Sequence, residues 1–166
     1  MTALVSQTPA TAGHWDATLA GEIIAAHVGL EGAALPILHA LQEEFGYVPK
    51  QSEPMIADAL NVSRAEVHGV ISFYHDFRRT PPGRHVLKVC RAEACQSVGA
   101  AAMADRLLAR LGMAWGGTTR DGSLTVEPTF CLGLCACGPA ALLDGEPLAR
   151  LDDAGLHAVI EKARHT

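Results

Sequence analysis

Five cysteines constrain this 166-residue chain more than any other feature of its sequence. Four residues separate Cys90 from Cys95, three separate Cys131 from Cys135, and Cys137 follows two residues later. The N-terminus has no basic segment followed by an apolar stretch, so we expect no secretory signal and a reducing, cytoplasmic setting. In that setting such cysteines are metal ligands or redox groups more often than disulfide partners. Their number is odd, and that oddness is the feature to explain.

The first half of the chain is predicted to be helical. Residues 1–15 are small, polar and without periodicity, which predicts a flexible tail. Residues 16–82 contain four amphipathic segments with short connections, which indicates a small helical bundle. The expected helices span about 16–27, 36–45, 53–60 and 63–77, with Asp16, Ser52 and Ser63 as N-caps and Gly46 just past the second helix. Ser63 and Glu66 have the spacing of a capping box.

The hydrophobic period changes after the helix-breaking run Arg79-Thr80-Pro81-Pro82-Gly83. Strands are expected at 85–90, 124–127, 141–143 and 147–151, and helices at 97–111 and 152–163. Asp144-Gly145 indicates a turn between the last two strands, in a connection that we expect to be longer than a two-residue hairpin. This β-α-β-β-α order resembles the thioredoxin-like fold. We therefore expect an α+β protein, with a helical bundle at 16–82 and a thioredoxin-like α/β domain with a mixed sheet at 83–166.

The fold would bring the two cysteine pairs together, because each pair follows one of two neighbouring parallel strands. Four thiolates in one place need a metal, since unneutralised anions repel each other. A [2Fe–2S] cluster takes four thiolates, two on each iron, and a structural zinc ion also takes four. Disulfide exchange is disfavoured because it needs the C-x2-C spacing, which is absent. The spacing alone does not separate zinc from iron and sulfur.

The residues around the cysteines favour the cluster. An anionic iron–sulfur centre needs backbone N–H groups directed at its sulfur atoms, and Gly133 between Cys131 and Cys135 would let the backbone curl around them. We expect the apolar neighbours Phe130, Leu132 and Leu134 to keep water away. Because reduction adds negative charge to an anionic centre, we expect a low reduction potential.

Several segments resemble the thioredoxin-like [2Fe–2S] ferredoxin family, which includes the E subunit of NADH:quinone oxidoreductase and subunits of NAD-linked hydrogenases and formate dehydrogenases. They are Gly69-Val70-Ile71-Ser72-Phe73-Tyr74 with Phe77, Gly83-Arg84-His85, Val89-Cys90, Cys95, and Cys131-Leu132-Gly133-Leu134-Cys135. The resemblance covers about residues 18–164. It implies that Cys90, Cys95, Cys131 and Cys135 hold one [2Fe–2S] cluster and that Cys137 lies outside the ligand set. Two segments, 90–95 and 137–140, are most similar to the gamma subunit of soluble NAD-dependent formate dehydrogenase.

The resemblance implies a non-catalytic electron-transfer subunit. It would exchange electrons with the FMN of a neighbouring NAD-binding subunit, in a complex that oxidises formate at a molybdenum or tungsten centre on an iron–sulfur catalytic subunit. The equivalent subunit of NADH:quinone oxidoreductase or of an NAD-linked hydrogenase is the alternative host. A zinc-stabilised assembly module and a helix-turn-helix regulator are alternatives of other classes.

Charge and motif content weigh against other functions. The net charge of -5 lies entirely within residues 1–82, which disfavours binding to nucleic acid or to anionic membranes. The helix-turn-helix pattern at 56–67 would direct Arg64 and His68 at DNA, but it is acidic overall and is better explained by helix packing. The nearly uncharged run 130–143 is too short to span a bilayer. His75 and His85 are expected to be exposed or hydrogen-bonded, and no catalytic arrangement is apparent.

Overall fold

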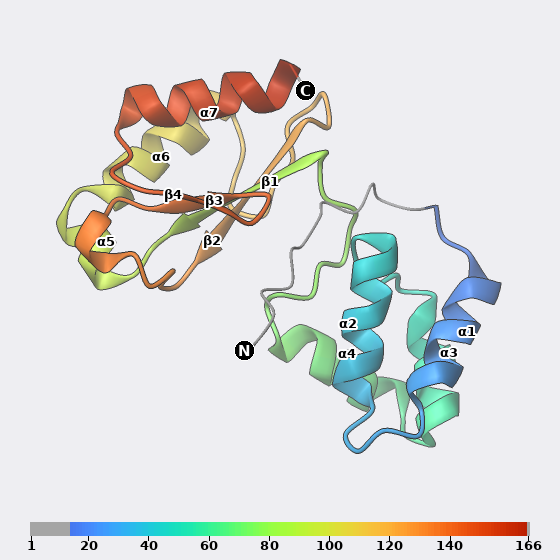
Figure 1. Cartoon of the computed structure of the whole chain (residues 1–166). Helices are drawn as coiled ribbons and strands as arrows, with labels where there is room; N and C mark the ends of the chain where they lie inside the picture. The colour runs from blue at the N-terminus through green and yellow to red at the C-terminus, as the bar shows by residue number, and fades with distance from the viewer. Residues whose placement is uncertain (1–13, 166) are drawn as a thin grey trace. The chain divides into compact units, whose positions relative to one another are not determined.

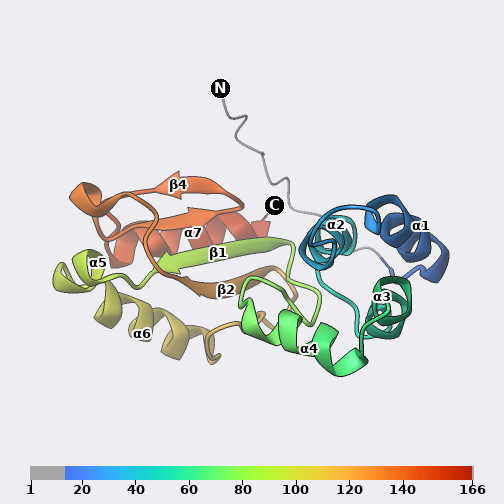
Figure 2. The same cartoon turned by 90° about the horizontal axis from the view of Figure 1, so that it is seen from below.

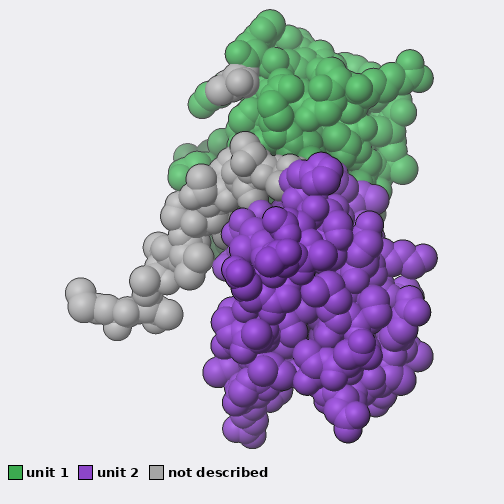
Figure 3. Space-filling view, turned by 90° about the vertical axis from the view of Figure 1, so that its right-hand side faces the viewer, with its two compact units in different colours: residues 1–9, 82–166 green, residues 10–81 purple. Residues whose placement is uncertain are grey.

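Pro81 and Pro82 mark the boundary between two separately packed units (Figure 3). The computed structural model describes residues 14–165, so residues 1–13 of the expected tail lie outside the described part of the chain. The helical unit contains α1 (Ala17–His27), α2 (Ala34–Phe45), α3 (Ser52–Leu60) and α4 (Arg64–Phe73). The second unit contains β1 (His85–Cys90), α5 (Glu93–Ser97), α6 (Ala100–Leu111), β2 (Leu124–Thr129), the 3-10 turn η1 (Cys135–Cys137), β3 (Ala141–Leu143), β4 (Glu146–Leu148) and α7 (Asp153–His165) (Figure 1). The expected α+β thioredoxin-like fold is confirmed.

Local signals set most boundaries of the helical unit. The Asp16 carboxylate accepts hydrogen bonds from the N–H groups of Thr18 and Leu19 at 2.8 and 3.2 Å, so it caps α1 as expected. Both halves of the capping box between Ser63 and Glu66 are present at the start of α4. Gly46 ends α2 in the left-handed region with φ of 79°.

Three details of the helical unit differ from the expectation. Helix α2 begins at Ala34, two residues before Pro36. Ser52 does not cap α3, because it is the first helical residue and its hydroxyl donates to the carbonyl of Pro49 at 2.7 Å. Helix α4 ends at Phe73, since the backbone of Tyr74 is extended. Leaving the helix there lets Phe77 turn back and become buried in the core.

The core of the helical unit is apolar and joins all four helices. Its fully buried side chains include Ile37, Leu38, Leu41, Phe45 and Ile56. One carboxylate is also buried: Glu53 on α3 pairs with Arg79, and the ring of His68 on α4 lies 3.6 Å from the same oxygen. Burial raises the pKa of Glu53, but its partners Arg79 and His68 outweigh that effect and leave the pKa below its ordinary value.

The four-stranded sheet of the second unit has the order β2-β1-β3-β4. Strands β1 and β2 are parallel, whereas β3 pairs antiparallel with both β1 and β4. Helices α6 and α7 pack on one face of this sheet (Figures 1 and 2). Leu87, Val89, Leu124 and Val126 point from β1 and β2 into the resulting core. The predicted parallel pair followed by an antiparallel hairpin is confirmed.

Two connections in this unit were predicted incorrectly. The helix expected at 97–111 begins only at Ala100 as α6, because Gly99 before it has a φ of 94° that suits glycine, and the short helix α5 was not predicted. The link between β3 and β4 is a two-residue turn, because Asp144 and Gly145 both have positive φ, as a tight primed turn requires. Strand β4 consequently begins at Glu146 and ends at Leu148.

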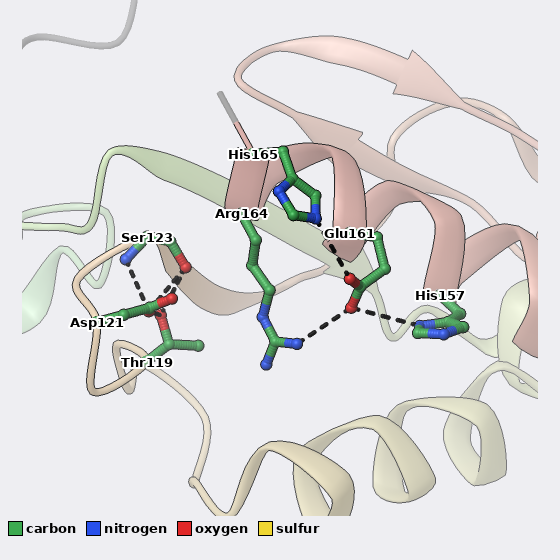
Figure 4. Close-up of polar contacts among 7 residues, drawn as sticks. All are labelled: Thr119, Asp121, Ser123, His157, Glu161, Arg164 and His165. Atoms are coloured by element: carbon green, nitrogen blue, oxygen red, sulfur yellow. Dashed lines mark hydrogen bonds and ion pairs between the residues drawn. The ribbon is translucent and has the colours of Figure 1, made fainter.

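Polar contacts at the sheet end opposite the cysteines stabilise the loop before β2 and the end of α7 (Figure 4). The Asp121 carboxylate accepts hydrogen bonds from the Thr119 hydroxyl and from the backbone N–H and hydroxyl of Ser123, which hold its pKa well below the usual range. On α7, Glu161 pairs with Arg164 and lies within 4 Å of His157 and His165.

Over residues 14–165, no helix has the length and apolar character needed to cross a bilayer.

Candidate metal centre

The carboxyl ends of β1 and β2 bring the two cysteine pairs together. Cys90 is the last residue of β1 and stands in register with Thr129, the last residue of β2. The chain continues from β1 into α5, which carries Cys95, and from β2 into the loop that carries Cys131 and Cys135. Because the strands are parallel, both continuations start at the same edge of the sheet.

The four thiols lie as two interacting pairs. The Sγ atoms of Cys131 and Cys135 are 3.7 Å apart, and the thiols of Cys90 and Cys95 are within hydrogen-bond reach of each other. The two pairs also interact electrostatically. Negative charge on Cys135 raises the pKa of Cys95, and negative charge on Cys90 raises the pKa of Cys135. Cys137 is a partly exposed free thiol at the end of η1.

One pair is buried and the other faces solvent. Cys90 and Cys95 are both 2% exposed, whereas Cys131 and Cys135 are exposed. Any group bridging the pairs would therefore have an inner side held by the strand end and α5. Its outer side would be held by the loop.

The surroundings stabilise negative charge on Cys90 but not on Cys95, the other thiol of the inner pair. Burial raises the pKa of Cys90, but the backbone N–H groups of Ala92, Cys131 and Leu132 and the Cys95 thiol donate to its sulfur, so the pKa is lower than usual. Burial, with the hydrogen bond to Cys90, raises the pKa of Cys95 against the opposing N–H of Ala140. The pKa of Cys135 is raised mainly by its hydrogen bond with Cys131. Backbone N–H groups directed at sulfur are what an anionic iron–sulfur centre needs.

Glycine and positive φ shape the outer loop. Cys131 and Gly133 both have φ of 75°, so the backbone turns sharply between the two outer thiols, as the central glycine indicated. Gly138 approaches the inner pair closely. A Cβ at that position would lie 3.3 Å from the Cys95 sulfur and 3.2 Å from Val98.

The prediction for one shielding residue was wrong, and several contacts were missed. Leu132 and Leu134 do pack against Cys90 and Cys95, but Phe130 is 73% exposed and points its side chain to solvent. The backbone donors Ala92 and Ala140 were missed, because no sequence pattern reports where an N–H points. The nearness of Gly138 to Cys95 was also missed, although the Gly138-Pro139 pair is a visible sign of constrained backbone.

His85 lies away from the thiols, and His75 is exposed to solvent. His85 starts β1, at the end of the strand opposite Cys90, and its Nδ1 is 2.6 Å from the Asp144 carboxylate. His75 is exposed. The expectation that both are exposed or hydrogen-bonded is confirmed.

The two thiol pairs supply the donor set of a two-iron centre. A structural zinc needs four ligands around one point, whereas a [2Fe–2S] cluster needs two thiolates on each of two irons. Two thiol pairs, with backbone N–H donors on the inner one, match the second requirement.

Several known proteins are similar to this chain in sequence. The E subunit of NADH-quinone oxidoreductase from Pseudomonas aeruginosa is 32% identical over 129 residues, and that from Escherichia coli is 34% identical over 130; each match covers 78% of both chains. The HndA subunit of the NADP-reducing hydrogenase from Solidesulfovibrio fructosivorans is 34% identical over 113 residues, which cover 68% of this chain and 66% of HndA.

Solved structures of an NAD+-reducing [NiFe]-hydrogenase contain a similar part. In the H2-reduced state the match has a TM-score of 0.64 at 31% identity and covers 89% of this chain, but only 23% of the hydrogenase chain. The model of the thioredoxin-like [2Fe-2S] ferredoxin family matches residues 20–164. The chain therefore belongs to the thioredoxin-like [2Fe–2S] ferredoxin family, and its cofactor is a [2Fe–2S] cluster.

Proposed function

We propose that this chain is a non-catalytic electron-transfer subunit whose [2Fe–2S] cluster is bound by Cys90, Cys95, Cys131 and Cys135. The observation that carries the assignment is the meeting of these four thiols as two pairs at one sheet edge, with backbone N–H groups directed at the inner pair. When bound, the cluster supplies one-electron storage and transfer. The protein holds it, stabilises its negative charge through N–H dipoles and covers its inner side.

The ligand set is tested by two neighbouring substitutions. Cys131→Ser should lose or strongly perturb the cluster, because it removes one of the two outer thiolates. Cys137→Ser is the matched control, since it is the same chemical change a short way along the chain and should leave the iron content near normal. Equal loss of iron from both variants would refute the assignment of ligands.

The partner that we propose is an FMN- and NAD-binding subunit in a cytoplasmic complex. The similar proteins carry names of NADH-quinone oxidoreductase and of NADP- and NAD+-reducing hydrogenases. In the hydrogenase structure the matching part is about a quarter of a longer chain. In the hydrogenase, the part that matches this protein is covalently joined to the rest of a longer chain. We therefore expect this protein to bind a separate subunit instead.

For the host complex we propose a molybdenum- or tungsten-containing, NAD-dependent formate dehydrogenase. Support comes from the residues of segments 90–95 and 137–140, which resemble its gamma subunit. The names of the relatives favour NADH:quinone oxidoreductase or an NAD-linked hydrogenase as the alternative host.

Isolation of the chain with its native partners separates these hosts. The purified complex should reduce NAD with formate and should contain molybdenum or tungsten. Reduction of NAD by hydrogen, or oxidation of NADH by quinone without formate activity, would contradict the formate dehydrogenase assignment while leaving the electron-transfer role intact.

A further inference from the structure

Arg91 follows Cys90 directly, so its backbone stands at the sheet edge where the cysteine-bearing segments begin. Its N–H donates a hydrogen bond to the carbonyl of Thr129, the last residue of β2, at 2.8 Å. The Nε2 of Gln96 on α5 donates to the Arg91 carbonyl at 2.5 Å. The backbone of Arg91 is therefore fixed between the end of β2 and α5.

The side chain of Arg91 is held by an aromatic ring. Its guanidinium carbon lies 5.1 Å from the ring centroid of Trp115, a distance at which a cation and an aromatic ring attract each other. Residues 116–119 hydrogen-bond to β2 on the side away from β1, with the N–H of Gly116 donating to the carbonyl of Val126 at 2.8 Å. Trp115 therefore lies beside the second half of β2, and Arg91 reaches across the end of that strand to the ring.

The charge of Arg91 is fixed in place without a partner of opposite charge. Arg91 and Trp115 are both half-buried. Over residues 14–165, no carboxylate forms an ion pair with Arg91. Because arginine stays protonated in proteins, the sheet edge carries a constant positive charge at this place.

The other charged residues near this edge contribute less. Lys88 and Glu127 lie two residues before the ends of β1 and β2, and their charged groups are 4.0 Å apart, so their opposite charges largely cancel. Glu93 at the start of α5 is exposed, and so is Arg150, whose N–H donates to the carbonyl of Cys137. Water and salt screen such exposed charges.

We propose that Arg91, held against Trp115, raises the reduction potential of the [2Fe–2S] cluster. Reduction adds one negative charge to an anionic centre, and a fixed positive charge beside its ligands stabilises the reduced form. Arg91 acts through space and binds neither iron nor sulfide, so it is a positioning residue for charge. This inference rests on the proposed ligand set. It adds a residue that determines how readily the cluster accepts an electron.

Redox titration of the cluster-loaded full chain, followed by electron paramagnetic resonance, tests the proposal. Arg91→Gln removes the charge and keeps a polar side chain, so the potential should shift to a lower value. Arg91→Lys keeps the charge but stacks less well on a ring, and its potential should shift less than about half as far.

Arg84→Gln is the matched control, because it removes the same charge from an exposed arginine just before β1. At about 3.3 Å per residue, Arg84 lies about 20 Å along the strand from Cys90. That distance is more than twice the Debye length of about 8 Å at about 0.15 M salt. The shift in this variant should therefore be less than about a third of the shift in Arg91→Gln.

The iron content of each variant shows whether its cluster is intact. If Arg91→Gln loses iron, Trp115→Leu replaces it in the titration, because this change keeps the arginine and removes the ring that holds it; its potential should also fall. An unchanged potential in the intact variant would refute the proposal. Equal shifts in Arg91→Gln and Arg91→Lys would point to packing, and a shift of equal size in Arg84→Gln to overall charge; either would overturn it. A wild-type chain without iron would overturn the proposed function itself, and this inference with it.

Discussion

Replacing Gly138 by alanine tests whether the backbone must approach the Cys95 sulfur closely. Gly138 has φ of -68° and ψ of 161°, a conformation that alanine adopts without strain and that suits a residue before proline. At such a position Gly→Ala usually stabilises a protein by about 0.4–1 kcal/mol, because it restricts the unfolded chain. Any loss of stability would therefore come from the added methyl group.

The structure gives the size of that effect. The methyl carbon would lie 3.3 Å from the Cys95 Sγ and 3.2 Å from Val98 Cγ2, so both neighbours would have to move by a few tenths of an ångström. Val98 is half-exposed and can rotate, but the Cys95 sulfur cannot if it binds iron as we propose. Overpacking of this kind costs about 1–3 kcal/mol, and we expect a net loss of about 1 kcal/mol after the chain-entropy gain.

The assay compares Gly138→Ala with Gly69→Ala. Gly69 lies in α4, where an added Cβ meets nothing within 4 Å, so alanine there should stabilise by about 0.5–1 kcal/mol through helix propensity. Denaturant unfolding followed by circular dichroism gives both free energies, and the visible absorbance of the cluster reports its loss. Gly138→Ala should unfold more easily and lose the cluster sooner than wild type. If it is as stable as wild type or more stable, with an unchanged cluster spectrum, the close approach to Cys95 is irrelevant.

Two further substitutions test the units that position the site. Glu53→Gln should lower the free energy of unfolding by about 1–2 kcal/mol near pH 7, because it leaves Arg79 without its buried partner. Since the folded-state pKa of Glu53 is depressed, the pair contributes fully above the unfolded-state pKa of about 4.3 and its contribution is lost as pH falls through the folded value. Equal destabilisation at about pH 7 and about pH 3 in urea titrations would disprove this role of the pair. Gly83→Ala should cost about 3 kcal/mol, because the new Cβ would lie 2.9 Å from the carbonyl oxygen of Gly122 and 3.0 Å from the Leu124 nitrogen, which are backbone atoms that cannot move aside. A thermal midpoint within about 2 °C of wild type would show that this approach is not tight.

The sequence was most informative where one local signal decides a structure. The Asp16 cap, the Ser63 capping box and the Gly46 helix end all lie where their side chains or φ angles demand. The strand 85–90 was predicted to the residue, since alternation and the following cysteine loop delimit it. The two cysteine pairs could be placed together because parallel strands must end at the same edge.

The errors arose where tertiary contacts or backbone direction decide. Phe130 has the composition of a shielding residue, but only the path of the chain after β2 shows that it faces solvent. Gly99 fits the pattern of an alanine-rich helix, whereas its φ of 94° separates α5 from α6. The N–H donors at Ala92 and Ala140 belong to the backbone, so the identity of their side chains carries no trace of their role.

The most direct test of the central claim is iron and acid-labile sulfide analysis of the anaerobically purified chain, joined to electron paramagnetic resonance after reduction. We expect a coloured protein with iron and sulfide in equal amounts and the signal of one reduced [2Fe–2S] cluster. A colourless protein that contains one zinc ion and neither iron nor sulfide would contradict the assignment of the cluster.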